Sequence, residues 1–317
     1  MTDSESAQWP EIPFEPWKET IANLHMMTQI VGKVRLMRTP WLNHSWHVTL
    51  YVSARGLTTS TIPYGGRVFE MEFDFIDQVL VIRASDGQER RIDLKPGSIA
   101  DFYAQVMAAL EKIGLPVQID EIPNEVVEAV RFGDDSTARP YDADAVHRFW
   151  LALVQVDRVL KLFRTRFLGK CSPSHFFWGS FDQSVTRFSG RSAPRHPGGF
   201  PNLSDAVTVE AYSHEVSSAG FWPGGGAVDY PAFYSYAYPV PDGFADASVQ
   251  PEAAFFLKEL SEFVLPYDAV RTAGDPDETL VSFLQSTYEA AADAADWDRE
   301  TLECPQGQLN LPRAVPG

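Results

Sequence analysis

Cysteine and positive charge are both scarce in this 317-residue chain. It has two cysteines, Cys171 and Cys304, and no CxxC pair, which excludes a disulfide framework and is typical of a reducing cytoplasm. It has 26 Lys and Arg against 43 Asp and Glu, a formal net charge of −17. This balance disfavours nucleic acids and anionic membrane surfaces as partners, because both attract positively charged proteins.

Long apolar runs and the strong catalytic motifs are missing as well. No stretch approaches ~18 consecutive apolar residues, so we expect no membrane span. The N-terminal MTDSESAQWPEIP has neither the basic region nor the apolar core of a secretory signal. The P-loop, the Rossmann glycine fingerprint, HExxH and GxSxG do not occur. We therefore expect a cytoplasmic globular protein whose chemistry no common motif reveals.

Aromatic side chains are abundant: 21 Phe, 11 Tyr and 8 Trp make up 13% of the chain, within 44% hydrophobic residues. Large rings supply buried area and also stack against flat ligands. This richness indicates either a heavy core or a lined pocket.

Periodicity divides the chain into helices and strands. Helical spacing of apolar residues, with capping or stop signals, occurs at 17–38, from Ser98 to Gly114, at 143–168 and at 276–295. Strand patterns occur at 46–53, 67–75, 78–84, 89–94, 175–188, 208–219, 231–239 and 253–265. The order predicts an α+β fold with one or more antiparallel sheets covered by long helices.

The two halves of the chain resemble each other. QIVGKVRLMRTPWLN (29–43) aligns with QVDRVLKLFRTRFLG (155–169), and an aromatic segment with a histidine follows each. One interpretation is a duplication of helix–four-strand–helix halves; the other is two amphipathic helices that share Arg-Thr by chance. We divide the chain into an N-terminal extension (1–16), a first half (17–120), a connection (121–141), a second half (142–300) and a disordered tail (301–317).

The segment GKCSPSHFFWGSFDQSVTRFSGR (169–191) concentrates chemistry and rings. As one continuous strand, it would place His175 and Asp182 on opposite faces, one against the core and one lining a cavity. A Cys171–His175–Asp182 nucleophilic triad would need a break, for instance at Gly179. The alternative for Cys171 is a small buried hydrophobic residue.

Histidines suggest a metal hypothesis. In AYSHEVSSAGFWPGGG (211–226), His214 would share a face with His175 if the two strands were neighbours. Two imidazoles and a carboxylate are a common set for zinc or non-haem iron, so a divalent metal cofactor is one hypothesis. The alternative is a hydrogen-bonded histidine in an aromatic core. His44 and His47 of NHSWH would bind one ion only from a loop.

These residues define a candidate site in the second half for a small organic molecule, which the protein would bind and, as an enzyme, transform. Two arginines would steer an anionic group, unless they form surface ion pairs. The alternative is a non-catalytic ligand- or protein-binding module with structural histidines. The predicted set is catalytic His175, Asp182, His214 and Glu215; ligand-binding Trp178, Ser180, Arg187, Arg191 and Trp222; and metal-binding His175 and His214.

Several strings point to a known family. They are WPEIPFEPW (9–17), SARGLTTS (53–60), GKCSPSHFFWGSFD (169–182), TRFSGR (186–191), AYSHEVSSAGFWPGGG (211–226) and LQSTYEAAADAA (284–295). Over about residues 9 to 300 the chain resembles a bacterial family filed as a domain of unknown function, number 5996. The family has no established activity, so the resemblance implies one family architecture along the chain and no mechanism.

Overall fold

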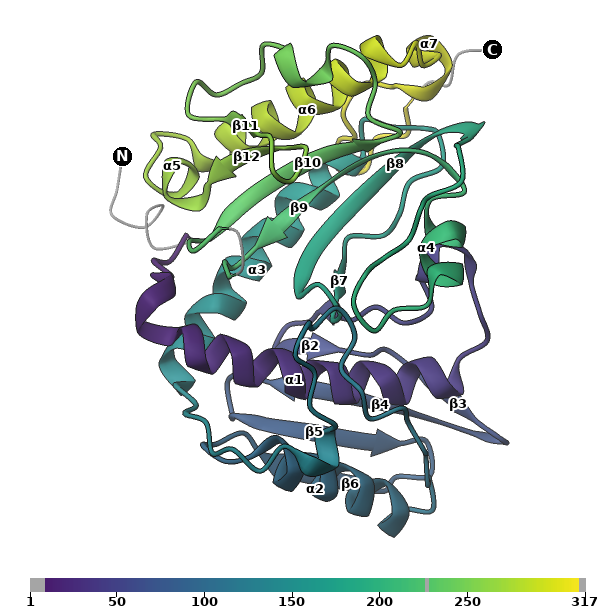
Figure 1. The fold of residues 1–317 in the computed structure, drawn as a ribbon, viewed down its shortest axis with the longest axis vertical. Helices are drawn as coiled ribbons and strands as arrows, with labels where there is room; N and C mark the ends of the chain where they lie inside the picture. The colour runs from purple at the N-terminus through teal and green to yellow at the C-terminus, as the bar shows by residue number, and fades with distance from the viewer. Residues whose placement is uncertain (1–8, 226–227, 314–317) are drawn as a thin grey trace.

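Two antiparallel sheets, one in each half of the chain, organise the fold (Figure 1). The computed structural model describes residues 9–225 and 228–313. Each sheet has six strands, so the expected α+β class with antiparallel sheets is confirmed, whereas the expectation of four strands in each half is wrong. The duplication itself stays a prediction.

The first half contains helix α1 (Phe14–Arg38), a sheet and helix α2 (Ile99–Lys112). The strand order is β1-β2-β4-β5-β6, with β3 also paired to β4. The strands are β1 (Tyr51–Val52), β2 (Gly56–Thr58), β3 (Ile62–Tyr64), β4 (Arg67–Asp74), β5 (Val79–Ala84) and β6 (Glu89–Asp93).

The second half begins with helix α3 (Ala143–Arg164), and its strand order is β11-β12-β10-β9-β8-β7. Its strands are β7 (His175–Phe177), β8 (Asp182–Ser192), β9 (His214–Trp222), β10 (Ala232–Tyr238), β11 (Phe255–Leu257) and β12 (Glu262–Pro266). Its other helices are α4 (Asp205–Ala211), α5 (Tyr267–Arg271), α6 (Pro276–Ala294) and α7 (Arg299–Leu302).

Local signals explain the helix starts. The side chains of Ser98, Asp142 and Asp275 each accept a hydrogen bond from a backbone N–H in the first turn of α2, α3 and α6. Helix α1 has no such cap, and all four predicted helices are confirmed with small shifts of their ends.

Three predicted strands are wrong in detail. Residues 175–188 form a hairpin, because the chain turns between Phe177 and Asp182, where Phe181 has a φ of 61°. Residues 253–265 form a second hairpin, β11 to β12. Residues 208–219 begin inside α4, because Ser204 caps that helix, and strand β9 starts only at His214.

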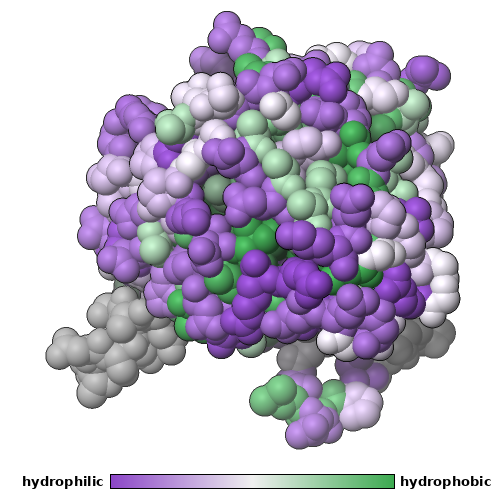
Figure 2. Space-filling view, turned by 90° about the horizontal axis from the view of Figure 1, so that it is seen from below, coloured by the Kyte–Doolittle hydropathy of each residue, from purple (hydrophilic) through white to green (hydrophobic). Residues whose placement is uncertain are grey.

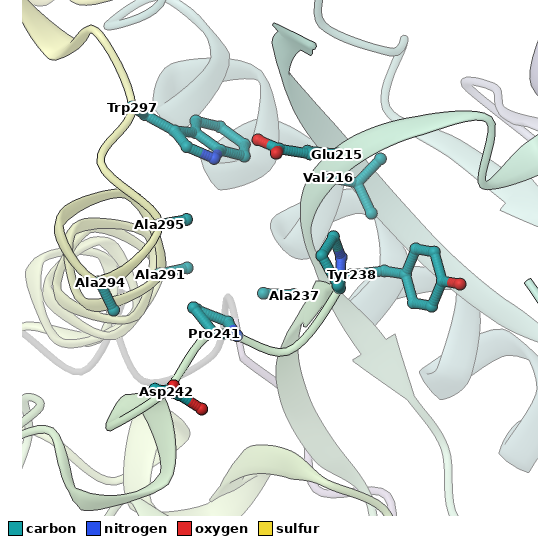
Figure 3. A pocket seen from close by; sticks show the side chains of 11 residues that line it. Glu215, Val216, Ala237, Tyr238, Pro241, Asp242, Ala291, Ala294, Ala295 and Trp297 are labelled. Carbon is teal, nitrogen blue, oxygen red and sulfur yellow. The ribbon is translucent and has the colours of Figure 1, made fainter. Parts of the chain in front are cut away.

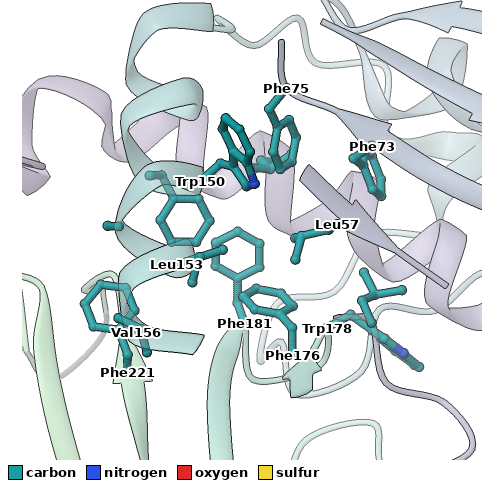
Figure 4. Packing of buried hydrophobic residues seen from close by; sticks show 14 of the residues in the cluster. Leu57, Phe73, Phe75, Trp150, Leu153, Val156, Phe176, Trp178, Phe181 and Phe221 are labelled. Carbon is teal, nitrogen blue, oxygen red and sulfur yellow. The ribbon is translucent and has the colours of Figure 1, made fainter. Parts of the chain in front are cut away.

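One contiguous core joins the two halves. Along α3, Trp150, Leu153 and Val156 face rings from both sheets (Figure 4). Leu50 of the first half and Phe176 of β7 exchange two backbone hydrogen bonds of 2.8 Å, which connects the halves beside this core.

Both described ends of the chain pack against the second half. Trp9, within the predicted extension, is 3% exposed and lies 6.0 Å from the ring of Tyr267. Glu303, within the predicted disordered tail, pairs with Phe167, which follows the end of α3. Both segments therefore take part in the fold as far as they are described; residues 1–8 and 314–317 lie outside the described residues.

The outside of the first half is mainly polar. Seen from below, the molecule presents a largely hydrophilic face with apolar residues in a central strip (Figure 2). Across residues 9–225 and 228–313, no helix has the length and apolar content needed to cross a lipid bilayer.

Candidate functional site

A cavity of about 800 Å³ lies over one face of the second sheet. Strands β8, β9, β10 and β12 form its floor, while α3 and α6 cover the opposite face of the same sheet. A volume of this size holds a drug-sized molecule. The floor residues are Asp182, Ser184, Thr186, Phe188, Val216, Ser218, Trp222, Tyr234, Tyr236, Tyr238, Glu262 and Val264.

Strand alternation places these side chains together. Thr186 of β8, Ser218 of β9 and Tyr236 of β10 lie opposite one another across the sheet, and the hydroxyls of Thr186 and Ser218 are 2.8 Å apart. Residues two positions away share the face because side chains alternate along a strand. The sequence FYSYAY therefore directs Tyr234, Tyr236 and Tyr238 into the cavity.

A glycine of β9 makes room for Tyr234. Gly220 of β9 lies opposite Tyr234, and a methyl group at this position would overlap both the Tyr234 ring and the backbone oxygen of Gln183. The missing side chain lets Tyr234 lie across β9 and reach Asp182 on β8.

The segment from 193 to 213, with α4, forms another wall of the cavity. His196 stacks on Tyr212 at 4.7 Å, and the Tyr238 hydroxyl donates a hydrogen bond of 3.1 Å to the carbonyl of Pro194. The Glu125 backbone N–H donates to Pro201, 2.7 Å away, which ties this wall to the connection between the halves.

Asp182 is the most buried acid of the cavity, at 7% exposure. The hydroxyls of Ser180 and Tyr234 each donate a hydrogen bond to one of its two carboxylate oxygens. Burial raises the pKa of Asp182, and these two hydrogen bonds lower it again in part.

Two further carboxylates face the same space. Burial, and then repulsion from Asp182, raises the pKa of Glu125 to about 7 and that of Glu262 to about 7. Gly179 leaves the room that the Glu125 carboxylate occupies, because a methyl group there would overlap it. Asp182 thus repels both Glu125 and Glu262, and its charge is part of the reason why the pKa values of these two acids are raised.

The remaining polar groups of the cavity are mostly uncharged donors. Burial raises the pKa of Tyr212 and Tyr234 well above 10 and that of Tyr236 to about 12, so all three hydroxyls keep their protons at neutral pH. In the described chain, no lysine or arginine lines this cavity. Burial lowers the pKa of the two histidines in the lining, His44 and His196, so the charge of the cavity at neutral pH comes from its carboxylates.

Four of the predicted site residues line the cavity: Trp178, Ser180, Asp182 and Trp222. The hairpin turn explains this grouping, since it reverses the chain and brings Trp178 and Ser180 close to Asp182. The other five, His175, Arg187, Arg191, His214 and Glu215, are not among the described residues that line it.

The predicted metal pair is not formed. On the shared neighbour β8, His175 pairs with Ser184 and His214 with Ser192, which are eight residues apart. The two histidines therefore lie at different places along β8, with the irregularity between Phe188 and Ser192 separating them, and they do not face one ion. Within residues 9–225 and 228–313, no group of three His, Cys, Asp or Glu could hold a metal ion.

The Cys171–His175–Asp182 triad is not formed either. Asp182 bonds to Ser180 and Tyr234, whereas both ring nitrogens of His175 lack a partner in the described structure. Cys171 lies opposite Arg187 and is a partly buried residue packed against the core, close to the alternative interpretation.

The loop NHSWH does not assemble a metal site. The His44 Nε2 lies 2.5 Å from the Lys170 ammonium and its Nδ1 lies 2.8 Å from the Ala211 carbonyl oxygen. The His47 Nδ1 instead accepts a hydrogen bond from the backbone of Leu42.

The two arginines expected to hold an anion lie elsewhere. Arg187 faces the core, with its guanidinium 3.5 Å from the centre of the Phe163 ring. Arg191 forms an ion pair of 2.7 Å with Glu215. Glu215 faces a smaller pocket of about 260 Å³ between the sheet and α6, where it lies beside Trp297 (Figure 3).

Sequence reasoning missed several lining residues. The alternation of Tyr234, Tyr236 and Tyr238 was a readable signal, because three rings at a spacing of two predict one aromatic face. Glu125 gave no signal, since it lies in an irregular acidic connection. Glu262 follows a turn between two short strands, so its face depended on a hairpin that the pattern did not reveal.

Comparison with known families matches residues 9–304 to one described as "Family of unknown function (DUF5996)". No curated protein and no solved structure matches the chain.

Proposed function

The chain belongs to the family of unknown function DUF5996, and we propose that it binds a small organic molecule carrying a positive charge in the 800 Å³ cavity of its second half. The observation that carries the proposal is the pairing of three carboxylates with aromatic walls and no lining cation among the described residues. Aromatic faces and carboxylates both attract organic cations, most strongly where water is excluded.

The chemistry of the lining argues for an amine or quaternary ammonium rather than an anion. An anionic ligand would meet Asp182, Glu125 and Glu262 without the two arginines that the sequence suggested. A cation would instead favour the ionised carboxylates and lie against the aromatic rings that line the cavity, among them Tyr234 and Tyr236. The tyrosine hydroxyls would orient polar substituents as hydrogen-bond donors.

Proton transfer to or from the bound molecule is a second candidate function. Groups that titrate near pH 7 inside a cavity suit general acid–base catalysis, and Glu125 and Glu262 both do. Tyr234 and Ser180 would then hold Asp182 in place beside them. A non-catalytic binding module remains the alternative, with the same cavity and no turnover.

The cytoplasm is the compartment we propose. Cys171 and Cys304 are both unpaired, as is usual for proteins of a reducing compartment.

Calorimetry with three matched probes tests the proposal. Benzyltrimethylammonium, its uncharged isostere neopentylbenzene and the anion phenylacetate present the same ring with different charges. We expect the cation to bind at least about 10-fold more tightly than the other two, a difference of about 1.4 kcal/mol. Asp182→Asn should remove most of that preference, while Glu70→Gln on the first sheet should leave it unchanged.

Tighter binding of phenylacetate, or equal binding of all three probes, would overturn the proposal. Rising pH should strengthen binding of the cation between about pH 6 and 8, because Glu125 and Glu262 lose their protons there. For the proton-transfer candidate, deuterium uptake by a bound probe in D₂O is the decisive measurement, with Glu125→Gln as the variant that abolishes it.

A further inference from the structure

The floor of the cavity changes in chemistry along strand β10. Near the start of β10, Tyr234 donates its hydrogen bond to the buried carboxylate of Asp182. The next side chains of the same face are Tyr236 and then Tyr238, at the end of the strand. Because a strand rises by about 3.3 Å per residue, Tyr238 lies about 13 Å from Tyr234 along β10.

The floor becomes apolar toward the end of β10. In the row beyond the hydroxyls of Thr186 and Ser218, Val216 pairs with both Phe188 and Tyr238. The Tyr238 hydroxyl donates to a backbone carbonyl, so it is satisfied without a ligand. A ligand that reaches this row therefore meets apolar surface.

Some large apolar side chains of the lining stay exposed to solvent. They are Trp41, Phe200, Val240 and Leu260. Val240 follows the end of β10 and is 48% exposed, and Leu260, in the turn before β12, is 39% exposed. Since Ser235 pairs with Phe263 in antiparallel strands, the end of β10 and the start of β12 lie at the same end of the sheet.

An exposed ring from the wall segment lies at this end as well. Phe200 is 42% exposed, and its ring centre lies 6.0 Å from that of His196, which in turn lies 4.9 Å from that of Tyr238. Phe200, Val240 and Leu260 thus come from three separate segments and lie at the Tyr238 end of one cavity. Exposed apolar side chains gathered at a cavity indicate a surface that binds an apolar group.

The carboxylates lie toward the other end. Glu125 occupies the space beside Gly179, in the turn that leads into Asp182. By the register of β10 and β12, Glu262 lies at the level of Tyr236. The cavity therefore carries its acids and hydroxyls up to the row of Tyr236, and its floor is apolar beyond that row.

We propose that the ligand is an amphiphilic amine, with its cationic head at Asp182 and its apolar tail directed toward Phe200, Val240 and Leu260. This inference rests on the function proposed above and adds the class of ligand. A short amine would fill only the acidic end and leave the exposed apolar end in contact with water. A tail that spans the roughly 13 Å from Tyr234 to Tyr238 would cover that end, and burial of the two apolar surfaces against each other is favourable.

The test is calorimetry with butyl-, octyl- and decyltrimethylammonium, each below the concentration at which it forms micelles. The three probes share one cationic head and differ only in the tail. We expect the affinity to rise at least about 10-fold from the butyl to the octyl compound, because each buried methylene group contributes favourably to binding. Decyl sulfate, with the same tail as the decyl compound and an anionic head, should bind more weakly than decyltrimethylammonium.

Two double variants show where the tail lies. Val240→Ser/Leu260→Ser should lose most of the gain in affinity from butyl to octyl. Val68→Ser/Ile76→Ser replaces two apolar residues of the first half that are 41% and 48% exposed and lie outside the cavity lining, so it should keep the gain.

The outcomes separate this inference from the function on which it rests. If the cations bind but octyl binds no more tightly than butyl, or if both double variants keep the gain equally, the tail site is wrong and the cation preference stands. If decyl sulfate binds as tightly as decyltrimethylammonium, the cation preference itself is wrong, and the ligand is not an amine.

Discussion

The outer faces of the two sheets carry similar residues in different surroundings. On the first sheet, Arg83 of β5 lies 2.9 Å from Glu72, 3.3 Å from Glu89 and 3.5 Å from Glu70, and these groups are partly exposed. Over the second sheet, Asp182 and Glu262 of its strands and Glu125 of the connection face a cavity that no lysine or arginine of the described chain lines. The same acidic composition thus gives a solvated ion-pair network in one half and an unneutralised pocket in the other.

The difference shows what a covering segment does to a carboxylate. Exposed to water and paired with Arg67, Asp86 of the first half has its pKa lowered to about 2. Enclosed beside Asp182, Glu262 has its pKa raised to about 7. Charge content alone therefore does not locate a site; the loss of water and of counter-charges does.

The largest effect should come from Gly220→Ala in the second sheet. The added methyl group overlaps the Tyr234 ring and the Gln183 carbonyl, so we expect a loss of about 2–3 kcal/mol in the free energy of unfolding. Gly66→Ala, in an open turn of the first sheet, should change it by less than about 0.5 kcal/mol. Urea unfolding of both variants measures the contrast; equal losses would contradict the packing described for Tyr234.

Replacing Glu125 and Glu262 by glutamine should make the protein more stable than the wild type at neutral pH. The folded pKa values of Glu125 and Glu262, about 7, lie above the ordinary 4.5. Their protons therefore favour the folded state below about pH 4.5, and this contribution is lost as pH rises through 7. We expect Glu125→Gln/Glu262→Gln to gain about 1–2 kcal/mol per residue over the wild type between pH 5 and 8, after allowance for partial exposure.

Asp86→Asn is the control of opposite sign. The pKa of Asp86 is lowered, so its ion pair favours the folded state above about pH 4, and this contribution is lost as pH falls through 2. The variant should be less stable than the wild type at neutral pH and equal to it in strong acid. Urea unfolding at neutral pH compares both variants with the wild type. A change of stability in the same direction for both would contradict the difference described between the two faces.

Tyr234→Phe should have a smaller effect, about 1 kcal/mol in stability, because Asp182 keeps only the hydrogen bond from Ser180. Removal of a donor also raises the pKa of Asp182 further, which NMR titration of its carboxyl carbon measures. Tyr64→Phe, whose exposed hydroxyl bonds to the Pro116 carbonyl in the first half, should change neither quantity.

The smallest effect should come from Arg83→Met. Exposed ion pairs contribute little, so we expect a loss of less than about 1 kcal/mol that shrinks further in high salt. A larger, salt-independent loss would mean that the outer face of the first sheet is not a solvated surface.

Much of the fold was readable because its signals are local. The stripe of α3 and the caps Asp142 and Asp275 predicted their helices, and the Asp86-Gly87 turn marked the β5–β6 hairpin. The hairpin at 178–181 was not readable, since Phe181 adopts a left-handed backbone conformation that its residue type does not announce.

The part of the candidate site that lies in one local segment was predictable, and the rest was not. Trp178, Ser180 and Asp182 belong to one local segment, so recognising that segment found all three. His175 and His214 looked like a pair only because the spacing of their strands was unknown, and β8 separates them.

By itself, the sequence determined the class of fold, the helices and the absence of the common catalytic motifs, because these depend on residue type and short-range spacing. Only the tertiary structure decided which charges lose water and which keep a partner. Glu125, Asp182 and Glu262 are 57 and 80 residues apart in order along the chain, and their shared cavity arises from strand register and an enclosing segment.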